Sequence, residues 1–595
     1  MNNLGIVYSK TNTSFKMFSP NTGDVYLKLY NSYDALIPSY EYKLTRDGDF
    51  VSITLDGDYN NYYYLLNVCG LDTLDPYCKA CSINGEKGYI CDLSVTDPIG
   101  FREEKFIRPR TPIIYEMHVR DFTSDVTIKI PSNERGKFAG IKENIKTFNG
   151  LTSGIDYLVE LGVNYVHLLP IYDYGSVDER TSEPYNWGYD PVNYNCLEGS
   201  YSTNPYDPLT RIREFKELVQ RLHKNNIGVI LDVVYNHTYS TNSPLNLTAP
   251  NYYYRMKDGI FSNASGCGNE TRSDAPMYHD FMIDSIKYFV EEYHIDGFRF
   301  DLMGIHDVKT MNDIRYMLNN IYPDGSGKTI LMYGEPWFCN QSLCEYEPAN
   351  LDNVNKLDNN IAVFNPTFRD SMRGRHFGGL KKGYSQGIKS LLPQLRYAIA
   401  GATKKNASPS LNSYTQQVLY CSCHDDHTLF DHITLTCDDW ETIITTCKMC
   451  ATATLSALGM SFFQAGEEFF KTKSMYKNSY NKSDYINKLD WMRREEFDDV
   501  VKFYKGLIEL RKNNEVFTLD NLNPDFEIID PKSDVLAYRA GKIIYIINPT
   551  SHEYALDVEK YSKLYKIADL RGFKKELLTT NIVNSGDILI IQIGE

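Results

Sequence analysis

Residues 228–237 read Gly-Val-Ile-Leu-Asp-Val-Val-Tyr-Asn-His, and this stretch decides the fold. Its apolar run, Val229 to Val234, has the length of a buried strand, and polar side chains follow it at once. In proteins that alternate parallel strands with helices, polar residues at the carboxyl ends of strands carry the chemistry. The same pattern recurs on both sides of this stretch.

Seven further apolar runs of strand length occur from Thr111 onwards. They are Ile113 to Met117, Tyr165 to Leu169, Gly297 to Phe300, Ile330 to Tyr333, Ile361 to Phe364, Val418 to Cys421 and Ser461 to Gln464. Helical patterns separate them, as at Pro208 to Lys224 and Ile283 to His294, where apolar residues recur at three- and four-residue steps. Eight such strands predict an α/β fold, a (β/α)8 TIM barrel with insertions. The segment from Asn236 to Asp280 is too long for a simple connection, so we expect it to overhang the catalytic face.

The two ends of the chain differ in texture from the middle. Val25, Leu27 and Leu29 alternate with more polar residues, which is typical of a strand with one buried face. Alternation returns after a last helical pattern at Val500 to Arg511. The predicted units are an N-terminal β-sandwich at residues 1–95, the catalytic barrel at residues 96–514 and a C-terminal β-sandwich at residues 515–595.

Composition and charge exclude several classes of function. The 595 residues carry 62 Lys and Arg against 77 Asp and Glu, and the net charge of −15 repels phosphate backbones, so we expect no nucleic-acid partner. No apolar run is long enough to span a membrane, and the first residues lack the pattern of a secretory signal. The 47 Tyr and 28 Phe would suit a carbohydrate surface, although core packing is the commoner reason for aromatic residues.

The 13 cysteines are odd in number and scattered, which fits reduced thiols and predicts a cytoplasmic protein. Cys78 and Cys81 have metal-ligand spacing, as do Cys447 and Cys450, but neither pair has a second pair or a histidine pair nearby. We therefore expect no metal site of this kind. Asp- and Asn-rich loops offer oxygen ligands for calcium without the spacing of a dedicated site, so no cofactor is expected to be required.

Carboxylates stand at or just beyond four strand ends, at Asp232, Asp301, Glu335 and Asp425. One such residue can be a helix N-cap, but four in succession point to chemistry. Two converging carboxyl groups can serve as nucleophile and general acid in the cleavage of a glycosidic bond. Arg299 lies two residues before Asp301, on the same side of its strand, and would favour the ionised carboxylate. Tyr333 and Trp337 bracket Glu335 and are expected to raise its pKa.

These strand ends resemble, in order and spacing, the consensus regions of the α-amylase superfamily of glycoside hydrolases. The resemblance places Asp301 at the nucleophile position, Glu335 at the acid/base position and Asp425 at the transition-state-stabilising position. Residues 185–191, Tyr-Asn-Trp-Gly-Tyr-Asp-Pro, are similar to the segment that marks type I pullulanases. The N-terminal unit resembles the glycan-binding module that precedes such barrels. The resemblance spans about the whole chain.

The resemblance also implies roles for residues around the carboxylates. Asp232 would be a structural and hydrogen-bonding group, and His237 and His424 would bind sugar hydroxyls. The ring of Tyr189 would stack on the sugar that is cleaved. The remaining members of the implied substrate-binding set are Arg299, Trp187 and Trp337.

Three positions depart from the family pattern. Asp426 stands where Asn is common, Ser461 where Pro is common, and Pro366 where Asp is common. None of them removes a catalytic carboxylate. The first is expected to alter substrate binding and the dependence of activity on pH.

We expect a debranching enzyme that hydrolyses α-1,6 bonds in pullulan, limit dextrin or glycogen-derived glucans with retention of configuration. An α-1,4-acting amylase or neopullulanase and a glucan-branching transferase would use the same chemistry, because sugar can replace water as the acceptor. A non-catalytic glucan-binding protein is the alternative of another class. The presence of all three catalytic carboxylates argues against it.

Overall fold

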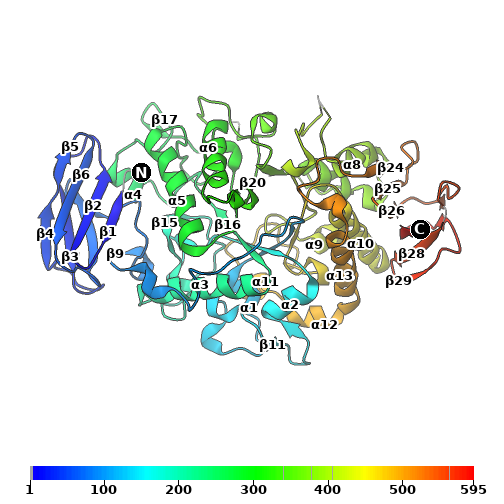
Figure 1. The fold of residues 1–595 in the computed structure, drawn as a ribbon, viewed down its shortest axis with the longest axis horizontal. Helices are drawn as coiled ribbons and strands as arrows, with labels where there is room; N and C mark the ends of the chain where they lie inside the picture. Colours follow the sequence, from blue (N-terminus) through cyan, green and yellow to red (C-terminus); the bar gives the residue numbers. More distant parts are fainter. Residues whose placement is uncertain (1–3, 340, 377, 405–406, 562, 595) are drawn as a thin grey trace.

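The computed structural model describes residues 4–339, 341–376, 378–404, 407–561 and 563–594. Figure 1 shows an elongated molecule with a β-sandwich at the amino-terminal end, a barrel in the middle and a second β-rich unit at the carboxyl-terminal end. The two termini therefore lie far apart, and the barrel connects the two outer units.

The barrel is closed by eight strands, each paired in parallel with its neighbours. They are β10 (Ile113–Met117), β13 (Tyr165–Leu168), β16 (Gly228–Val233), β19 (Gly297–Phe300), β20 (Leu331–Gly334), β21 (Ala362–Phe364), β22 (Gln417–Leu419) and β23 (Met460–Gln464). Alternate residues fill the barrel interior, among them Ile114, Ile230 and Phe462. Their neighbours along each strand face the surrounding helices, because successive side chains of a strand point to opposite faces. The barrel predicted from the sequence is confirmed.

The strand ends differ little from the predicted ones. Seven strands agree within one residue, whereas β22 ends at Leu419, two residues before the predicted end. The reason is that its last ladder partner is Ser461, opposite Leu419, so the chain beyond it is free to turn into a loop. His424 and Asp425 consequently stand on a loop several residues past the strand.

Helices surround the barrel and connect its strands. The longer ones are α2 (Gly154–Leu161), α3 (Pro208–Lys224), α5 (Pro276–Tyr293), α6 (Val308–Asn319), α7 (Pro366–Met372), α8 (Leu392–Ile399), α10 (Trp440–Ser456) and α13 (Asp498–Lys512). Shorter ones are α1 (Val119–Thr123), α4 (Pro244–Thr248), α9 (Leu429–Thr434), α11 (Asp484–Asn487) and α12 (Trp491–Glu496). The side chain of Asp207 caps α3 by accepting from the backbone N–H of Leu209, and Pro208 occupies the first turn, where no N–H is needed.

The helix predicted at Ile283 to His294 begins earlier than expected. Pro276 starts α5, so the last five residues of the loop predicted at Asn236 to Asp280 are helical. The start of this loop lies at the catalytic face, and Cys267 near its end lies close enough to Asp301 for their charges to interact. The middle of the loop packs on the N-terminal sandwich. There the hydroxyl of Ser19 donates to the carbonyl of Thr248 at 2.9 Å.

The N-terminal unit consists of two antiparallel sheets. One contains β1 (Gly5–Tyr8), β2 (Asn12–Phe18), β6 (Phe50–Asp56) and β5 (Thr45–Asp47). The other contains β4 (Tyr40–Lys43), β3 (Val25–Tyr30), β7 (Tyr63–Val68), β8 (Leu71–Thr73) and β9 (Gly88–Tyr89). Val25, Leu27 and Leu29 face a shared core with Phe15 and Met17, which confirms the alternation seen in the sequence.

The C-terminal unit is built on one six-stranded antiparallel sheet. Its strands, in spatial order, are β24 (Phe526–Ile528), β25 (Leu536–Ala540), β26 (Ile543–Asn548), β31 (Asp587–Ile593), β28 (Leu564–Asp569) and β29 (Gly572–Leu577). A two-stranded sheet of β27 (Tyr554–Ala555) and β30 (Ile582–Val583) shares a second apolar core with it. Arg396 of α8 donates to backbone carbonyls of residues 530, 531, 533 and 535, which anchors the unit to the barrel.

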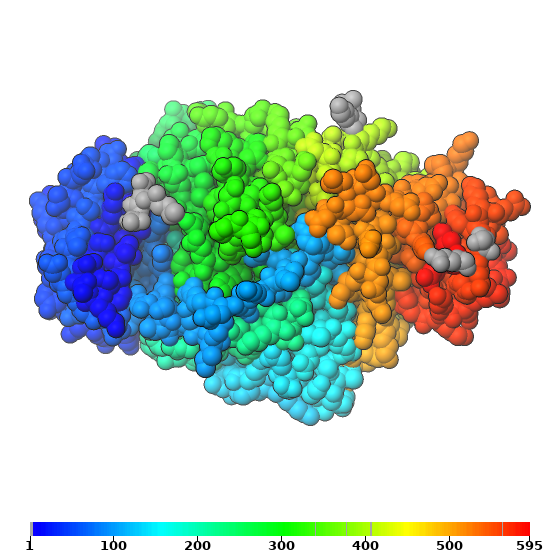
Figure 2. All heavy atoms as spheres, viewed as in Figure 1, coloured from blue at the N-terminus to red at the C-terminus, as the bar shows by residue number. Residues whose placement is uncertain are grey.

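The segment between the sandwich and the first barrel strand lies against the amino-terminal face of the barrel. Arg108 forms an ion pair at 2.8 Å with Asp296, which precedes β19. The hydroxyl of Tyr165 donates to the carbonyl of Pro109. Figure 2 shows this segment running across the surface of the barrel. The carboxyl ends of the strands, on the opposite face, are therefore left free for a site. Among helices in the described residues, none has the length and apolar character that a membrane crossing requires.

Candidate active site

One guanidinium joins three of the predicted site carboxylates. Nη1 of Arg299, on β19, lies 2.8 Å from Oδ1 of Asp232 and 2.9 Å from Oδ1 of Asp301. Its Nη2 lies 2.7 Å from Oε1 of Glu335, which directly follows β20. Because neighbouring parallel strands end at the same edge, side chains more than 100 residues apart in sequence meet around one buried arginine. The sequence placed these residues at one face, and the structure brings them into contact.

The three carboxylates have different proton affinities. Burial raises the pKa of Glu335 to about 7, helped by the nearby charges of Asp301 and Asp425 and opposed by Arg299. Burial also raises the pKa of Asp301, although Arg299 lowers it. Burial disfavours ionised Asp232 as well, but Arg299 and His167 outweigh it and hold the pKa at about 2. Glu335 is thus the group suited to carry a proton near neutral pH.

The backbone and a neighbouring amide fix the carboxyl groups of Asp301 and Glu335. Asn236 donates through Nδ2 to Oδ2 of Asp301 at 2.8 Å. Leu302 adopts a left-handed backbone conformation with φ of 40°, and its N–H donates to Oε2 of Glu335 at 3.0 Å. A nonglycine residue in this region is uncommon and costs energy, so it marks a constrained turn. The turn ties the first carboxylate to the second.

Asp425 is the accessible member of the set. Its side chain is 51% exposed, whereas that of Asp301 is 13% exposed and that of Glu335 8%. It lines a cavity of about 270 Å³ together with Glu335 and Arg299. The cavity residues are Glu116, Arg299, Glu335, Trp337, Phe364, Arg369, Tyr420, Cys423, Asp425 and Asp426. The cavity opens onto Glu335 and Asp425, so a bound sugar can reach both.

Tyr189 and His424 form a stacked pair beside this cavity. Their ring centroids are 4.9 Å apart with an angle of 19° between the planes. The Tyr189 hydroxyl donates to Oδ2 of Asp232 at 2.7 Å. Oε1 of Glu116, on β10, lies 2.7 Å from Nδ1 of His424. The predicted sugar-stacking ring is thus half-buried and held by two predicted site residues.

The other predicted binding residues differ in exposure. Trp337 is half-buried and lines the cavity. His237 is buried, and its ring nitrogens contact Asn236 and the carbonyl of Tyr189, while burial lowers its pKa to about 4. Trp187 is only 3% exposed and lies edge-on beneath His424. Trp187 therefore supports the histidine from behind.

The three departures from the family pattern have different surroundings. Oδ2 of Asp426 lies 2.6 Å from Nε2 of His376, and Asp426 also lines the cavity. Burial opposes ionisation of Asp426, but His376 outweighs it, so its pKa is lowered. Ser461 donates to the carbonyl of Thr454 inside the barrel wall, and Pro366 occupies the first turn of α7. Only Asp426 is in position to affect a ligand.

Sequence reasoning gave no role to several residues that the structure places at the site. Glu116 is the second-last residue of a predicted strand and Asn236 follows another one closely, so the rule that found Asp232 could have found them. Lys473 and Arg369 lie on segments without such a signal. Lys473 donates to the carbonyl of His424, and its ammonium lies 4.6 Å from the centre of the Trp187 ring.

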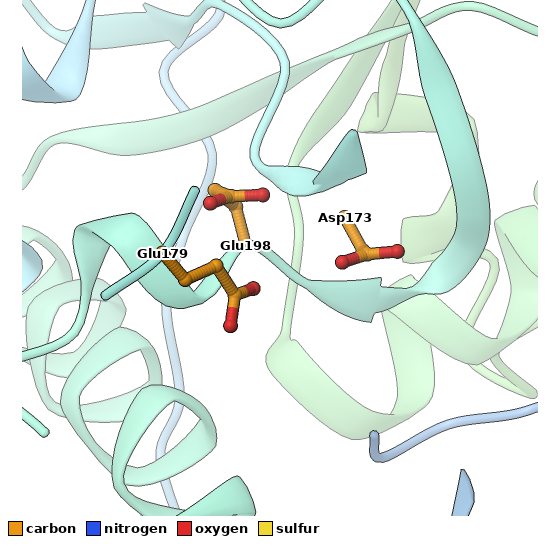
Figure 3. A group of neighbouring side chains, drawn as sticks. All are labelled: Asp173, Glu179 and Glu198. Carbon is orange, nitrogen blue, oxygen red and sulfur yellow. The ribbon is translucent and has the colours of Figure 1, made fainter. Parts of the chain in front are cut away.

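A second group of buried carboxylates lies at the junction with the N-terminal sandwich. It contains Asp173 of β14 (Tyr172–Tyr174), Glu179, and Glu198 just after β15 (Pro191–Leu197), with ligand atoms within 4.8 Å of one another. Figure 3 shows the three side chains grouped around a common space. It is the one group of three or more His, Cys, Asp or Glu side chains with metal-like spacing in the part of the chain that is described.

Protein groups already occupy much of the space around this junction cluster. Nη1 and Nη2 of Arg211 lie 2.9 and 2.8 Å from the two oxygens of Glu179. A Cβ on Gly85 would lie 2.5 Å from Oδ2 of Asp173, so only glycine fits there. Burial raises the pKa of Asp173 to about 7 and that of Glu198 well above its ordinary value, with Glu179 adding in both cases. These carboxyl groups are suited to hold protons.

Comparisons with known proteins place the chain among enzymes with this architecture. Residues 136–257 match the catalytic-domain model of α-amylase. A pullulanase from Bacillus subtilis (strain 168) is 35% identical, with 99% of this chain and 84% of that protein covered. The crystal structure of a pullulanase from Paenibacillus barengoltzii with maltohexaose and α-cyclodextrin has a TM-score of 0.90 and 34% identity, covering 100% of this chain and 96% of that one. A type I pullulanase from Bacillus subtilis strain 168 with maltose also has a TM-score of 0.90, at 32% identity, covering 100% and 86%.

Proposed function

We infer that this chain, which belongs to the type I pullulanases of the α-amylase superfamily, is a glycoside hydrolase that debranches α-1,6-linked glucans. One observation carries the chemistry: Arg299 holds the carboxyl groups of Asp301 and Glu335 together. Carboxyl groups that share a guanidinium are close, and a retaining mechanism needs a separation of about 5 Å. Burial keeps one of the two protonated near neutral pH.

We propose that Asp301 is the nucleophile and Glu335 the acid/base. In the first step Glu335 gives its proton to the glycosidic oxygen, the bond from that oxygen to C1 breaks, and Asp301 bonds to C1. In the second step the ionised Glu335 takes a proton from water, the water oxygen bonds to C1, and Asp301 leaves. Both carboxyl groups return to their initial states, and the configuration at C1 is retained.

The other site residues bind the substrate in this proposal. Asp425, exposed in the cavity, accepts from hydroxyls of the sugar and stabilises the positive charge that develops at C1. His424 donates to the same sugar, and Tyr189 presents its ring to it. Asp232 and Arg299 hold this arrangement in place, and His237 fixes the backbone of Tyr189 through its carbonyl.

The proposed substrates are pullulan and branched maltodextrins. Related structures contain maltohexaose, α-cyclodextrin and maltose, which supports a site for α-glucans. Hydrolysis of pullulan tests the linkage. We expect maltotriose as the product, whereas panose would show that the chain cleaves α-1,4 bonds. Branching transfer would instead produce longer branched chains from amylose, with little reducing sugar released.

We further propose that the reaction needs no metal and that the protein works in the cytoplasm. Cys78 and Cys196 support a reducing compartment, because their sulfur atoms lie 3.6 Å apart as free thiols. Oxygen and nitrogen groups of the chain supply every role in the two steps above. Turnover that is unchanged after dialysis against a chelator would support the first proposal, and its loss with recovery on adding calcium would overturn it.

A further inference from the structure

His424 is held from four directions by elements that are distant in sequence. Glu116 of β10 contacts Nδ1 at 2.7 Å, and Tyr189 stacks on one ring face. Trp187 meets the ring edge-on at 5.0 Å, and Lys473 donates to the backbone carbonyl. The remaining ring nitrogen, Nε2, lies 3.7 Å from Oδ2 of Asp425, on the side of the cavity. The ring can therefore serve the substrate through Nε2 alone.

Glu116 is unusual among the residues that surround His424. It is 2% exposed, and its Oε1 is directed at the histidine. Its other oxygen, Oε2, is buried and has no hydrogen-bond partner among the described residues. A buried carboxylate with one oxygen unpartnered is costly, so the fold maintains it at the expense of stability. Such a cost indicates a functional reason for the charge.

We propose that Glu116 is a positioning residue for the debranching reaction: its carboxylate holds the His424 ring by Nδ1, directs Nε2 to the sugar, and supplies the countercharge that keeps the ring a double donor. The proposal rests on the function inferred above. An imidazolium donates through both nitrogens, whereas a neutral ring with Nδ1–H bound to Glu116 can only accept at Nε2. With Glu116 in place, the histidine can donate to a sugar hydroxyl.

The charges around the pair favour this protonation state. Burial disfavours imidazolium, but Glu116 and Asp425 outweigh it and raise the pKa of His424 to about 9. His424 in turn lowers the pKa of Glu116, against the effect of burial. The other charged or titratable groups that face the pair include His167, Asp232, Arg299, Tyr189, Tyr333, Cys423, Lys471 and Lys473. Among them, Arg299 opposes the imidazolium and Asp232 interacts favourably with it.

The test uses α-maltotriosyl fluoride as a substrate for the full chain. Fluoride leaves with little help from an acid, so the alkaline limb of kcat/KM no longer reports Glu335 and reports His424 instead. We expect this limb near pH 9 in the unaltered protein, where the imidazolium loses its proton. Glu116→Gln keeps the shape and an acceptor oxygen but removes the charge. In this variant the midpoint of the alkaline limb should move to lower pH by at least one unit. At a pH above both midpoints, this shift lowers kcat/KM about tenfold.

Glu468→Gln is the matched control. Glu468 is also fully buried and binds the hydroxyl of Tyr115, the neighbour of Glu116 on β10, but on the outer side of the barrel. Its neutralisation should leave the limb of the fluoride reaction in place. Lys473, whose pKa burial lowers to about 8, is present in both variants, so its titration cancels in the comparison.

A merely structural role for Glu116 would lower kcat/KM equally at every pH, and coincident limbs for Glu116→Gln and the unaltered chain would overturn the proposal. If Glu116→Gln does not fold, Glu116→Asp provides a second arm. It keeps the charge on a shorter side chain, so kcat/KM should fall uniformly while the limb stays near pH 9. A limb at or below pH 7 in the unaltered protein would also contradict the inference. Failure of the proposed function would look different, because then neither the unaltered chain nor any of its variants would release maltotriose from pullulan at any pH.

Discussion

The catalytic face and the junction cluster are built from the same materials. Each gathers at least three buried or partly buried carboxylates near one buried arginine, Arg299 at the face and Arg211 at the junction. At the face, one carboxylate is half exposed and a cavity of about 270 Å³ reaches Glu335. At the junction, Gly85 and Arg211 close the space around the carboxylates.

The two arginines also contact their carboxylates differently. Arg299 spreads its guanidinium over three carboxylates, so each is partly neutralised and two remain free to react. Among the three junction carboxylates, Arg211 pairs only with Glu179, and Asp173 and Glu198 are left to hold protons. Burial and altered pKa values therefore do not by themselves make a catalytic site. Access for a ligand and a shared countercharge make the difference.

The largest expected effect separates the two regions by activity. Asp301→Asn keeps the size of the side chain but removes the nucleophile, so kcat/KM on pullulan should fall by about four orders of magnitude or more. Asp173→Asn makes the same change at the junction and should leave kcat/KM within about twofold. Circular dichroism spectra that match the unaltered protein are the control that both variants are folded. If the folded Asp301→Asn protein kept a tenth of the activity, Asp301 would not be the nucleophile, and the claim that the catalytic face differs from the junction cluster in carrying the reaction would be contradicted.

The next effect tests what the raised pKa of Glu335 is for. Glu335→Gln should lower kcat/KM on glucans by about 10³-fold, because their leaving group needs a proton. The formation of the intermediate from α-maltotriosyl fluoride should be largely spared, and azide should speed its breakdown. In the unaltered enzyme the alkaline limb on pullulan should lie near pH 7, since activity is lost when Glu335 ionises. Equal losses on glucan and fluoride, without rescue by azide, would assign the acid/base role to another carboxylate.

The smallest effect concerns the junction. Asp173 has a folded-state pKa of about 7, raised from 3.8, so the folded protein retains a proton that the unfolded chain has already lost. Its contribution to stability is therefore present below about pH 4 and is lost as the pH rises toward 7. Asn cannot ionise, so Asp173→Asn does not lose stability as the pH rises. The variant should therefore have a Tm about 2 to 4 °C higher than the unaltered protein at pH 8. The gain should be smaller at pH 5, and an equal gain at both pH values would show that the carboxyl group does not titrate.

The sequence predicted the barrel and the gathering of carboxylates at one of its faces for a physical reason. Eight apolar runs separated by helical patterns leave little freedom in topology, and neighbouring parallel strands end at one face. The carboxylates at or just after the ends of β16, β19 and β20 could therefore be placed together from their positions alone. The predicted start of α5, at Ile283, was wrong. Pro276 in the first turn of the helix is a sequence signal that favours the observed start.

Other features depend on contacts that no local pattern encodes. Asp173, Glu179 and Glu198 lie on loops and short strands, and Glu179 accepts from the backbone N–H of Asn84 in the sandwich only once the two units have docked. The pairing of Glu116 with His424 joins the first barrel strand to the loop after β22, across 308 residues. Side-chain burial decides whether Trp187 faces a ligand or supports His424, and it follows from packing and not from the motif.

If Asp301 is the nucleophile and Glu335 the acid/base, the reaction passes through a covalent intermediate in which C1 of the sugar is bonded to a carboxylate oxygen of Asp301. Glu335→Gln treated with α-maltotriosyl fluoride forms this intermediate but lacks the base that would hydrolyse it, so it should accumulate. Acid quenching, proteolysis and mass spectrometry then locate the sugar. We expect a trisaccharide on the peptide that contains Asp301, and no label when Asp301→Asn is combined with Glu335→Gln. A trisaccharide on Asp232 or Asp425, or rapid turnover without any label, would contradict the assignment of the two carboxylates.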